Sequence, residues 1–452
     1  MRKTIFISLF QAIEFRNIAR TDIYKELQRR PDIRIVFFTD SDGKKEHYES
    51  EFRAPNVVYE VVKGYAPAFP ASLFQFLKYN LIRSSTIDLK RIWELRESGN
   101  YPRFFFKLAF NRIFARRFAR KIARGLDYAL IREQFFAPYF ARYQPSLVLC
   151  AHLFSDVEVA MLREAKKRGI TTIGLINSWD KLTARSILRL LPDEMIVHNE
   201  LVKKDAVAHA DMDSSRIHVV GIPHFDYYVN TARASKTDFY KKYGIPPDRR
   251  IILFCPAGPA ASDADSQVLR LLADICAHPP APYSVTLFVR YPPNDRITKP
   301  PDYPNVIFQM PGKRFSLERG TDWDMNFGDF QSLADTLYYS SIVISYASTM
   351  SIDAAVFDTP IINLTIDFPG CRPTAEFYKV DHYQPVLATG AIQLVNTKEE
   401  LQEWIGRFLE YPELHRAQRA RLVREQCGAL DGRAGMRVAE ILINSLSTYE
   451  KK

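Results

Sequence analysis

Residues 341–367 read SIVISYASTMSIDAAVFDTPIINLTID, and this stretch decides the predicted fold. Residues 342–344 predict a strand buried on both faces of a parallel sheet, and residues 361–364 predict the next strand. Between them, the small hydroxyl residues of 345–351 predict a turn, and residues 353–357 predict a helix. A strand, a turn and a helix in this order direct backbone N–H groups and the positive end of the helix dipole at one point, which suits a phosphate.

Three hydroxyl groups and one carboxylate in this stretch are candidates for binding a nucleotide. Ser348, Thr349 and Ser351 add hydrogen-bond donors for a phosphate. Asp353 lies one turn into the helix, where a carboxylate can accept hydrogen bonds from ribose hydroxyls. The alternative is that Ser and Thr only cap the helix, with no ligand present. Both interpretations stay open at this point.

The rest of the chain alternates predicted strands and helices. In the first half we expect strands at 4–10, 33–39, 56–62, 146–150, 171–176, 194–198 and 217–220, with helices at 21–30 and 157–168 and a long helical region that ends near 143. In the second half we expect strands at 251–255, 285–289, 306–308 and 342–345, and helices at 267–278, 333–340, 401–409, 414–426 and 435–446. This alternation predicts α/β domains with parallel, doubly wound sheets. Ligands of such sheets bind beyond the carboxyl ends of the strands.

Size and composition limit the possible classes. A chain of 452 residues with 47% hydrophobic and 25% charged residues predicts two folded domains. No apolar run reaches the length of a membrane span, and the five cysteines are scattered without metal-ligand spacing, so we expect a cytoplasmic protein with buried thiols. The polar segment 230–250 suggests domains at 1–230, with a helical insert at about 70–143, and at 231–452.

Several segments carry a resemblance to a known family. They are NSWDKLTAR (177–185), VVGIPHFD (219–226), LFVRYPPND (287–295), STMSIDAAVFDTPIINL (348–364), EFYKVDHYQPVLATGA (376–391) and DGRAGMRVAEIL (431–442). Over roughly 146–446 the chain resembles the GT-B superfamily of glycosyltransferases, in particular the surface-carbohydrate proteins grouped with CDP-glycerol glycerophosphotransferases and UDP-GlcNAc 2-epimerases. The resemblance implies two Rossmann-like domains that face each other across a cleft, with the C-terminal helix packed back toward the N-terminal domain.

The resemblance also implies roles for residues of the second half. Asp353, seven positions before Pro360, matches an acidic position, usually Glu, that binds the donor ribose. Arg290 matches the first residue of an R-x-H-P element, with Tyr291 where His is usual, and its guanidinium fits a pyrophosphate. Four further residues are donor-side candidates because of the loops that carry them: Gly258, His224, Asp367 and His382. A salt bridge within the domain is the alternative for Arg290, and a structural network is the alternative for Asp367 and His382.

An inverting transferase also needs a general base for the acceptor hydroxyl. His152 and Asp156 follow the strand at 146–150, Asp180 follows the strand at 171–176, and His224 follows the strand at 217–220. A histidine titrates near neutral pH, and a carboxylate serves as a base where burial raises its pKa. Asp180 can instead cap the next helix, and His152 can be a buried core residue. We expect the base to be Asp156 or His152. The motif H-E-x-x-H and a Cys/His quartet are absent from the sequence, so no metal dependence is expected.

The formal net charge of +10 is concentrated in residues 101–125, YPRFFFKLAFNRIFARRFARKIARG, which contain no acidic residue. Phe106, Phe110, Phe114, Phe118 and Ile122 recur at four-residue steps, which on a helix makes an apolar stripe flanked by cations. Such a helix suits an anionic membrane surface at the inner face of the cell membrane. A helix packed into the domain with an exposed basic edge is the alternative. No nucleic-acid partner is expected, because no recognised module accompanies the charge.

The sequence therefore predicts a metal-independent glycosyltransferase of GT-B type without a cofactor. It is expected to transfer a sugar, or a polyol phosphate, from a UDP-, CDP- or GDP-linked donor to a surface glycan or lipid-linked acceptor. A nucleotide-sugar epimerase is one alternative, although the SGG-x-x-EE pattern of such enzymes is absent. A catalytically silent nucleotide- or glycan-binding scaffold is the other.

Overall fold

The computed structural model describes residues 2–67, 71–258, 262–280, 282–293, 303–315 and 323–448. These residues form two compact units. The first unit consists of Met1–Asp226, Val380–His382 and Gly428–Lys452, and the second consists of Tyr227–Lys379 and Tyr383–Cys427.

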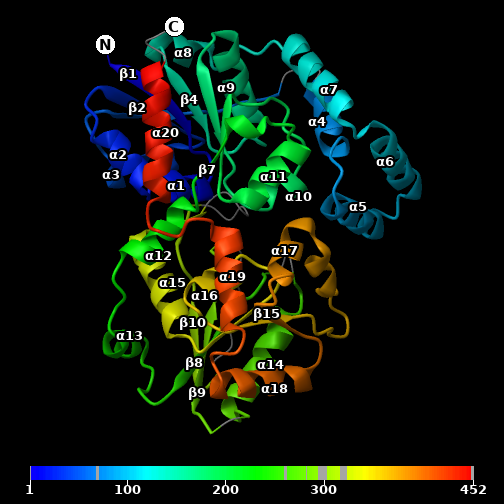
Figure 1. The fold of residues 1–452 in the computed structure, drawn as a ribbon, viewed down its shortest axis with the longest axis vertical. Helices are drawn as coiled ribbons and strands as arrows, with labels where there is room; N and C mark the ends of the chain where they lie inside the picture. The colour runs from blue at the N-terminus through cyan, green and yellow to red at the C-terminus, as the bar shows by residue number, and fades with distance from the viewer. Residues whose placement is uncertain are drawn as a thin grey trace. The chain divides into compact units, whose positions relative to one another are not determined.

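The first unit is built on a seven-stranded parallel sheet with the order β3-β2-β1-β4-β5-β6-β7 (Figure 1). Its strands are β1 Lys3–Ser8, β2 Ile33–Thr39, β3 Val57–Val61, β4 Leu147–Cys150, β5 Thr171–Leu175, β6 Glu194–Val197 and β7 Ile217–Val219. The strand order reverses between β1 and β4, because the chain builds outward from β1 in one direction and then from β4 in the other. In sheets of this kind that point opens a crevice at the carboxyl ends of the two strands.

Helices cover both faces of this sheet because successive strand residues point to opposite sides. On one face the core joins Phe6 and Val148 to α8 Ala137–Tyr143, α9 Asp156–Lys167 and α11 Glu200–His209. On the other face it joins Ile5, Ile7 and Leu149 to α1 Ala12–Ile18, α2 Asp22–Gln28, α3 Asp42–Glu51 and α20 Ala434–Thr448. The C-terminal helix α20 therefore packs on the first sheet, as the resemblance implied, whereas the predicted domain 231–452 had included it in the second half. The short helix α10 Lys181–Ala184 follows β5.

The second unit contains a six-stranded parallel sheet with the order β10-β9-β8-β13-β14-β15. Its strands are β8 Arg250–Phe254, β9 Val285–Arg290, β10 Val306–Gln309, β13 Ile342–Ser345, β14 Ile361–Leu364 and β15 Ile392–Val395. This is the strand order of the Rossmann fold, and the order reverses between β8 and β13. A separate antiparallel pair is formed by β11 Lys313–Arg314 and β12 Trp323–Asp324.

Seven α-helices of the second unit are α13 Lys236–Tyr243, α14 Asp265–Ala277, α15 Phe327–Tyr339, α16 Met350–Val356, α17 Gln384–Leu387, α18 Lys398–Glu410 and α19 Arg416–Cys427. The core on one face joins Phe254 and Ile344 of the sheet to Leu272 of α14 and Ile405 of α18. Where the chain passes between the units it forms α12 Asp226–Asn230. The predicted α/β class with two parallel, doubly wound sheets is confirmed.

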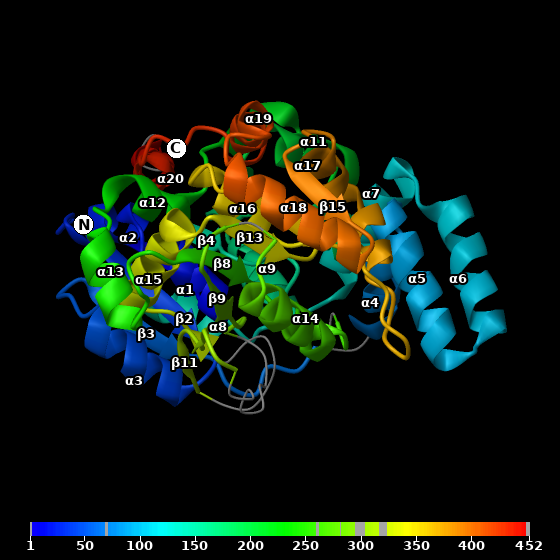
Figure 2. The same cartoon turned by 90° about the horizontal axis from the view of Figure 1, so that it is seen from below.

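The long helical region predicted before residue 143 consists of α8 and four further helices. These are α4 Ala71–Asn80, α5 Ser85–Ser98, α6 Tyr101–Phe114 and α7 Arg117–Leu130. Figures 1 and 2 show them grouped at one side of the first unit. The single stripe expected from Phe106 to Ile122 is wrong, because Arg116 is extended and separates α6 from α7. No helix in the described ranges is both long and apolar enough to cross a bilayer.

A buried group of charges attaches α7 to the rest of the first unit. Arg120 donates to both carboxylate oxygens of Asp211, from Nη2 at 2.6 Å and from Nε at 2.8 Å. Arg124 Nη1 donates to the same carboxylate at 2.7 Å. Asp127, on the same face of α7, accepts from Arg163 and from Arg189. Side chains with fixed charges of both signs thus hold the inner face of this helix.

Asp211→Asn should lower the free energy of unfolding by about 3 to 5 kcal/mol, because it leaves Arg120 and Arg124 buried without their carboxylate. Urea unfolding followed by circular dichroism measures the change. Asp213→Asn is the matched control, since Asp213 is exposed and bonds only to Ser215 in the next turn. Equal stability of the two variants would show that the buried charges do not hold α7.

Candidate functional site

Three ionisable side chains meet where the strand order of the first sheet reverses. Glu14 lies in the first turn of α1 after β1, His152 follows β4, and Glu158 lies in the first turn of α9. Their exposed fractions are 0%, 9% and 1%. Each residue offers a ligand atom within 4.8 Å of those of the other two. The carboxyl ends of β1 and β4 therefore bring together residues that are far apart in the sequence.

Each of these side chains has one polar atom with a hydrogen-bond partner and one without such a partner among the described residues. Glu14 Oε2 accepts from the backbone N–H of Phe10 at 2.6 Å and of Gln11 at 3.0 Å. Glu158 Oε2 accepts from the backbone N–H of His152 at 2.8 Å. The second carboxylate oxygens, Glu14 Oε1 and Glu158 Oε1, and the ring atom His152 Nδ1 are buried without a hydrogen-bond partner among the described residues. Unpartnered buried polar atoms in one place are costly, and they indicate a proton or a ligand there.

The pKa values of the three groups follow from burial. Burial raises the pKa of Glu14 from 4.5 to about 7. Burial, together with the nearby Glu14 carboxylate, raises the pKa of Glu158 well above its ordinary value. Burial and the charge of Lys181 lower the pKa of His152 to about 3, so the imidazole is neutral at neutral pH. Burial therefore favours the neutral form of each of the three groups, and a charge on Glu14 opposes the ionisation of Glu158.

Lys181 lies on the other side of the histidine. Its Nζ is 3.4 Å from His152 Nε2, and burial lowers its pKa. Asp180, the neighbouring residue, accepts from Ser178 and is half-buried. His382 lies in the same group: its ring stands edge-on to Trp179 at 5.0 Å, and its Nδ1 is 3.5 Å from Thr183 Oγ1. Sequence reasoning placed His382 with the donor site, whereas the structure groups it with Asp180 in the first unit.

The set Glu14, His152 and Glu158 also has the composition of a metal site. The nearby ammonium group of Lys181 opposes a divalent cation there, because like charges repel strongly in a buried site. The expectation of a metal-independent protein stays a prediction.

Asp156, predicted as a general base, has a different environment. Its carboxylate accepts from Gln75 Nε2 at 2.9 Å, Lys78 Nζ at 2.9 Å and Arg189 Nη1 at 3.0 Å. Burial acts to raise the pKa of Asp156, but Lys78 and Arg189 outweigh burial and lower it. A carboxylate held by two cations is a weak proton acceptor. We therefore assign Asp156 to the attachment of α4 to α9 and no longer favour it as the base.

In the second unit, Arg290 and Asp353 lie near the point where the strand order reverses. Arg290 ends β9 and is 5% exposed, and its guanidinium donates to the side chain of Gln309 and, at 3.2 Å, to the backbone oxygen of Asp329. It forms no ion pair with a carboxylate of the described residues, so the predicted alternative of a salt bridge within the domain is not realised. Burial lowers its pKa.

Asp353 lies in α16 and is 7% exposed. It accepts from the hydroxyl of Tyr228 at 2.6 Å. Asp353 and Arg290 share a neighbour: the pKa of the Cys255 thiol, which burial raises to about 12, is also affected by both charges. The structure thus brings two of the predicted donor-site residues to the carboxyl ends of β8 and β9.

The turn before α16 divides the predicted hydroxyl donors into two kinds. Ser348 is partly exposed and Thr349 is exposed at the start of α16. The Ser348 hydroxyl accepts from the backbone N–H of Met350 at 3.3 Å, so Ser348 caps this helix, as the alternative interpretation expected. Ser351 is fully buried, and its hydroxyl contacts Asn363 Oδ1 at 3.2 Å and the Tyr383 hydroxyl at 2.9 Å. Ser351 therefore stabilises the turn from inside the unit, which is a correction to its expected role as a phosphate donor.

Three further candidates differ in what they offer. Gly258 has a φ of 81°, which favours glycine, but its N–H donates to Asp265 Oδ2 at 2.8 Å. Asp367 is exposed after β14. His224 is half-buried in the first unit, where desolvation, Arg16 and His198 lower its pKa well below the ordinary value. The assignment of these three to a donor site stays a prediction.

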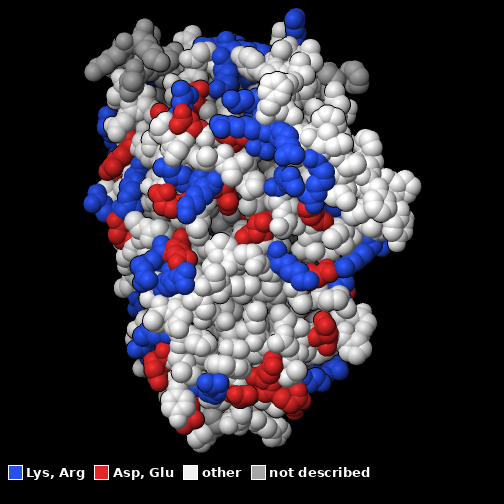
Figure 3. Space-filling view, turned by 45° about the vertical axis from the view of Figure 1, so that its right-hand side comes forward, with Lys and Arg blue, Asp and Glu red and all other residues white. Residues whose placement is uncertain are grey.

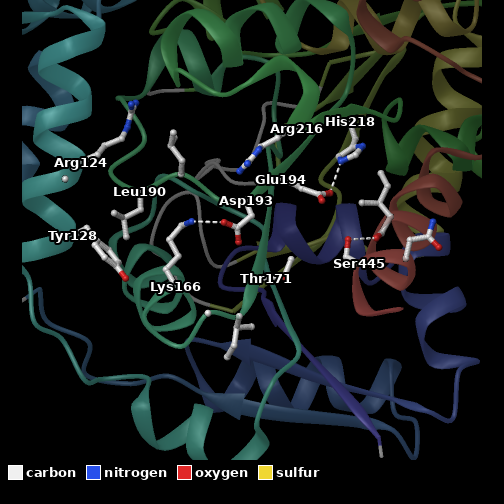
Figure 4. A pocket seen from close by; sticks show the side chains of 16 residues that line it. Arg124, Tyr128, Lys166, Thr171, Leu190, Asp193, Glu194, Arg216, His218 and Ser445 are labelled. Atoms are coloured by element: carbon white, nitrogen blue, oxygen red, sulfur yellow. Dashed lines mark hydrogen bonds and ion pairs between the residues drawn. The ribbon is translucent and has the colours of Figure 1, made fainter. Parts of the chain in front are cut away.

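A large cavity lies elsewhere in the first unit. It has a volume of about 1530 Å³ and lies at the amino ends of β5 and β6, at the edge opposite to Glu14 and His152 (Figure 4). Two of its basic side chains are ion-paired, Lys166 with Asp193 at 2.9 Å and Arg124 with Asp211 at 2.7 Å, and His218 Nε2 lies 2.8 Å from Glu194. Arg216, also in the lining, has no carboxylate partner among the described residues.

Sequence reasoning missed Glu14, Glu158 and Lys181. One signal was available for the first: Glu14 is the third helical residue after Gln11, the position from which a capping-box carboxylate reaches back to the backbone. Glu158 and Lys181 carry no such local signal, because the partners that give them their role come from other strands.

Comparisons with known proteins show the fold. No protein-family model and no curated protein sequence matches this chain. Among solved structures, it is similar to UDP-GlcNAc 2-epimerase from Neisseria meningitidis bound to UDP-GlcNAc, with 13% identity, a TM-score of 0.55, and coverage of 98% of this chain and 100% of that one. The wall teichoic acid polymerase TagF gives 12% identity and a TM-score of 0.53 over 100% of this chain and 90% of that one. The glycotransferase of kitacinnamycin gives 12% identity and a TM-score of 0.51 over 98% and 99%. The chain has the GT-B fold.

Burial of Glu14 predicts a pH dependence of stability. Its folded-state pKa of about 7 lies above the unfolded value of 4.5, so between these values the folded state keeps a proton that the unfolded state loses. The free energy of unfolding should therefore fall as pH rises through this window, by up to about 3 kcal/mol. Glu14→Gln should reduce this slope and leave the part that comes from the raised pKa of Glu158, as measured by urea unfolding at a series of pH values. A variant with the slope of the wild type would contradict the assignment.

Proposed function

We propose that this chain is a metal-independent glycosyltransferase of GT-B type that uses a nucleotide-activated donor. It transfers a sugar or a polyol phosphate, with inversion in the case of a sugar, to a surface glycan or lipid-linked acceptor. UDP-, CDP- and GDP-linked donors are the candidates. Solved structures of the same fold support this class, since they include proteins named as a UDP-GlcNAc 2-epimerase bound to UDP-GlcNAc, a UDP co-structure and a wall teichoic acid polymerase.

The observation that carries the proposal is the buried guanidinium of Arg290, which has no carboxylate partner among the described residues. A cation removed from water is costly unless an opposite charge compensates it. Its position at the end of β9 places it at the strand ends where Rossmann-type sheets bind their ligands. A diphosphate supplies the missing negative charge and the planar pairs of oxygens that a guanidinium binds best.

The remaining donor contacts follow from the same region of the second unit. The exposed turn at Ser348 and Thr349 offers hydroxyl donors beside the amino end of α16. Asp353 provides a carboxylate for ribose hydroxyls, and the Tyr228 hydroxyl that binds it fixes its orientation. In this arrangement Arg290 stabilises the negative charge that develops on the leaving group, which is a nucleoside diphosphate when a sugar is transferred and a nucleoside monophosphate when a polyol phosphate is transferred.

We assign the group that takes the proton of the acceptor hydroxyl to the first unit. His152 is the most exposed of the three grouped residues, but its pKa of about 3 makes the imidazole a weak base, so it contacts the acceptor hydroxyl without keeping the proton. The conjugate acid of His152 is unstable beside Lys181, and the carboxyl groups of Glu14 and Glu158 are the natural store for the proton. The pKa of about 7 of Glu14 suits general base catalysis at neutral pH.

One observation favours a second candidate, a nucleotide-sugar epimerase. That reaction needs several acid and base groups around one sugar, and the first unit contains two carboxyl groups and a histidine within 4.8 Å of one another. The products distinguish the two candidates. A transferase releases a free nucleotide, whereas an epimerase returns a nucleotide sugar of the same mass with one inverted carbon.

Nucleotide binding tests the donor site. Isothermal titration with UDP, CDP and GDP should show binding of at least one of them by the wild type. Arg290→Gln and Asp353→Asn should each weaken that binding by roughly tenfold or more, because each removes a hydrogen bond to or from a charged group. Glu403→Gln, an exposed change on α18, is the control. Wild-type affinity in both site variants would rule out the proposed donor site.

Turnover tests the proton acceptor. UDP-GlcNAc and CDP-glycerol are the probe donors, and free nucleotide is measured by chromatography in the presence of a chelator. Glu14→Gln should lower kcat by about 10² to 10⁴ and leave KM for the donor nearly unchanged, because general base catalysis typically contributes that much. Glu46→Gln on the exposed side of α3 is the matched control. Unchanged kcat and an unchanged pH profile in Glu14→Gln would exclude Glu14 from the reaction.

A further inference from the structure

The helix α7 is amphipathic, but its two faces are reversed relative to an ordinary surface helix. Its inner face carries the buried side chains Arg120, Arg124 and Asp127. Its outer face carries apolar side chains at four-residue steps, with exposed fractions of 75% for Phe118, 46% for Ile122, 48% for Leu126 and 55% for Leu130. A surface helix normally turns the apolar face inward.

The ion pairs of the inner face fix this orientation. Arg120 and Arg124 both bond to Asp211, and Asp127 bonds to Arg163 and Arg189. Rotating the helix to bury its apolar row would separate these pairs and leave several charges buried alone. The outward apolar row is therefore held in place by the fold.

The neighbouring helix α6 extends the apolar surface. Its exposed large side chains have exposed fractions of 47% to 63%, and they are Tyr101, Phe105, Phe106, Ile113 and Phe114. Both α6 and α7 contact α4, which itself exposes Leu73 and Tyr79. Figures 1 and 2 both show α6 and α7 at the edge of the first unit, away from its sheet. Single exposed apolar residues need no explanation, but a contiguous set of this size marks an interaction surface.

Cations border the apolar row. Arg117 and Lys121 each precede a member of the row by one position, about 100° around the helix. Arg116 and Lys121 are exposed, and neither has a carboxylate partner among the described residues. Figure 3 shows Lys and Arg side chains gathered over the first unit. The surface therefore combines apolar and aromatic side chains with unpaired positive charge.

We propose that α6 and α7 dock the protein on the surface of an anionic lipid bilayer. Aromatic and aliphatic side chains enter the boundary between headgroups and acyl chains, while Arg116 and Lys121 bind lipid phosphates. Charge complementarity selects this partner: a second copy of the same positive surface would be repelled, and an apolar protein groove would leave the cations unpaired. The inference does not depend on the transfer reaction.

Vesicle flotation with the full-length protein tests the proposal. The wild type should float with vesicles of equal parts phosphatidylcholine and phosphatidylglycerol. Its binding to vesicles of phosphatidylcholine alone should be weaker by roughly tenfold or more. Added salt should weaken binding to the anionic vesicles. Absence of wild-type binding to the anionic vesicles, or equal binding to both vesicles, overturns the proposal.

Two variants separate the apolar and charged contributions. Phe118→Ser with Ile122→Ser and Leu126→Ser should abolish flotation, and Arg116→Gln with Lys121→Gln should weaken it by roughly tenfold or more. The matched controls are Met310→Ser with Tyr411→Ser, and Lys241→Gln with Lys242→Gln, all at exposed positions of the second unit. The controls should float like the wild type, and circular dichroism should show all variants folded.

Sedimentation of the lipid-free protein tests whether a second copy of the chain, and not a lipid surface, covers α6 and α7. We expect the wild type and the Phe118→Ser, Ile122→Ser and Leu126→Ser variant to have the same oligomeric state. Wild-type oligomers that this variant abolishes, together with unchanged flotation of both, would show that the surface joins copies of the chain, and would overturn the lipid assignment. Nucleotide affinity measured on the same variants should equal that of the wild type, so a failure here leaves the proposed function untouched.

Discussion

The reversal of strand order in each parallel sheet is the constraint on which the rest of the structure depends. Between β1 and β4, and again between β8 and β13, the chain leaves the two strands toward opposite sides, and polar groups gather at the carboxyl ends. Glu14, His152 and Glu158 lie at the first of these points, and Asp353 lies beyond the second. The apolar strand residues are buried in the core, whereas the residues that follow them can be polar and can bind ligands or transfer protons.

Completeness of pairing separates structural charges from candidate functional ones. Asp156 and Asp211 are buried or half-buried carboxylates, and each is bonded to two basic side chains, so their charges are compensated within the chain. Within the described part of the chain, Arg290 is as deeply buried but hydrogen-bonds only to neutral groups, and Glu14 and Glu158 each keep one oxygen without a hydrogen-bond partner. Burying such unpaired groups costs folding free energy, and no contact within the described residues compensates it. A bound ligand or a transferred proton would.

The sequence predicted what depends on local pattern. The strands of the two parallel sheets except β15, the turn at Ser348 and the position of Asp353 follow from apolar periodicity and small residues within about thirty positions. Side-chain partners over long range could not be predicted. Asp156 is a poor base because Lys78 and Arg189 bind its carboxylate. The Ser351 hydroxyl points inward and contacts Asn363 and Tyr383. The pKa of Glu14 is raised because distant strands form the core that buries it.

One chain of ion pairs links the outer helix to the strand ends of the first sheet. Asp127 of α7 accepts from Arg189, Arg189 also donates to Asp156 at the first position of α9, and Lys78 of α4 donates to the same carboxylate. Glu158 lies two residues further along α9. The contacts that turn the apolar row of α7 outward therefore also set the position of the helix that carries Glu158. Removing one of these ion-paired charges disturbs both the orientation of α7 and the position of α9. The outward side chains of α7 can change without affecting either.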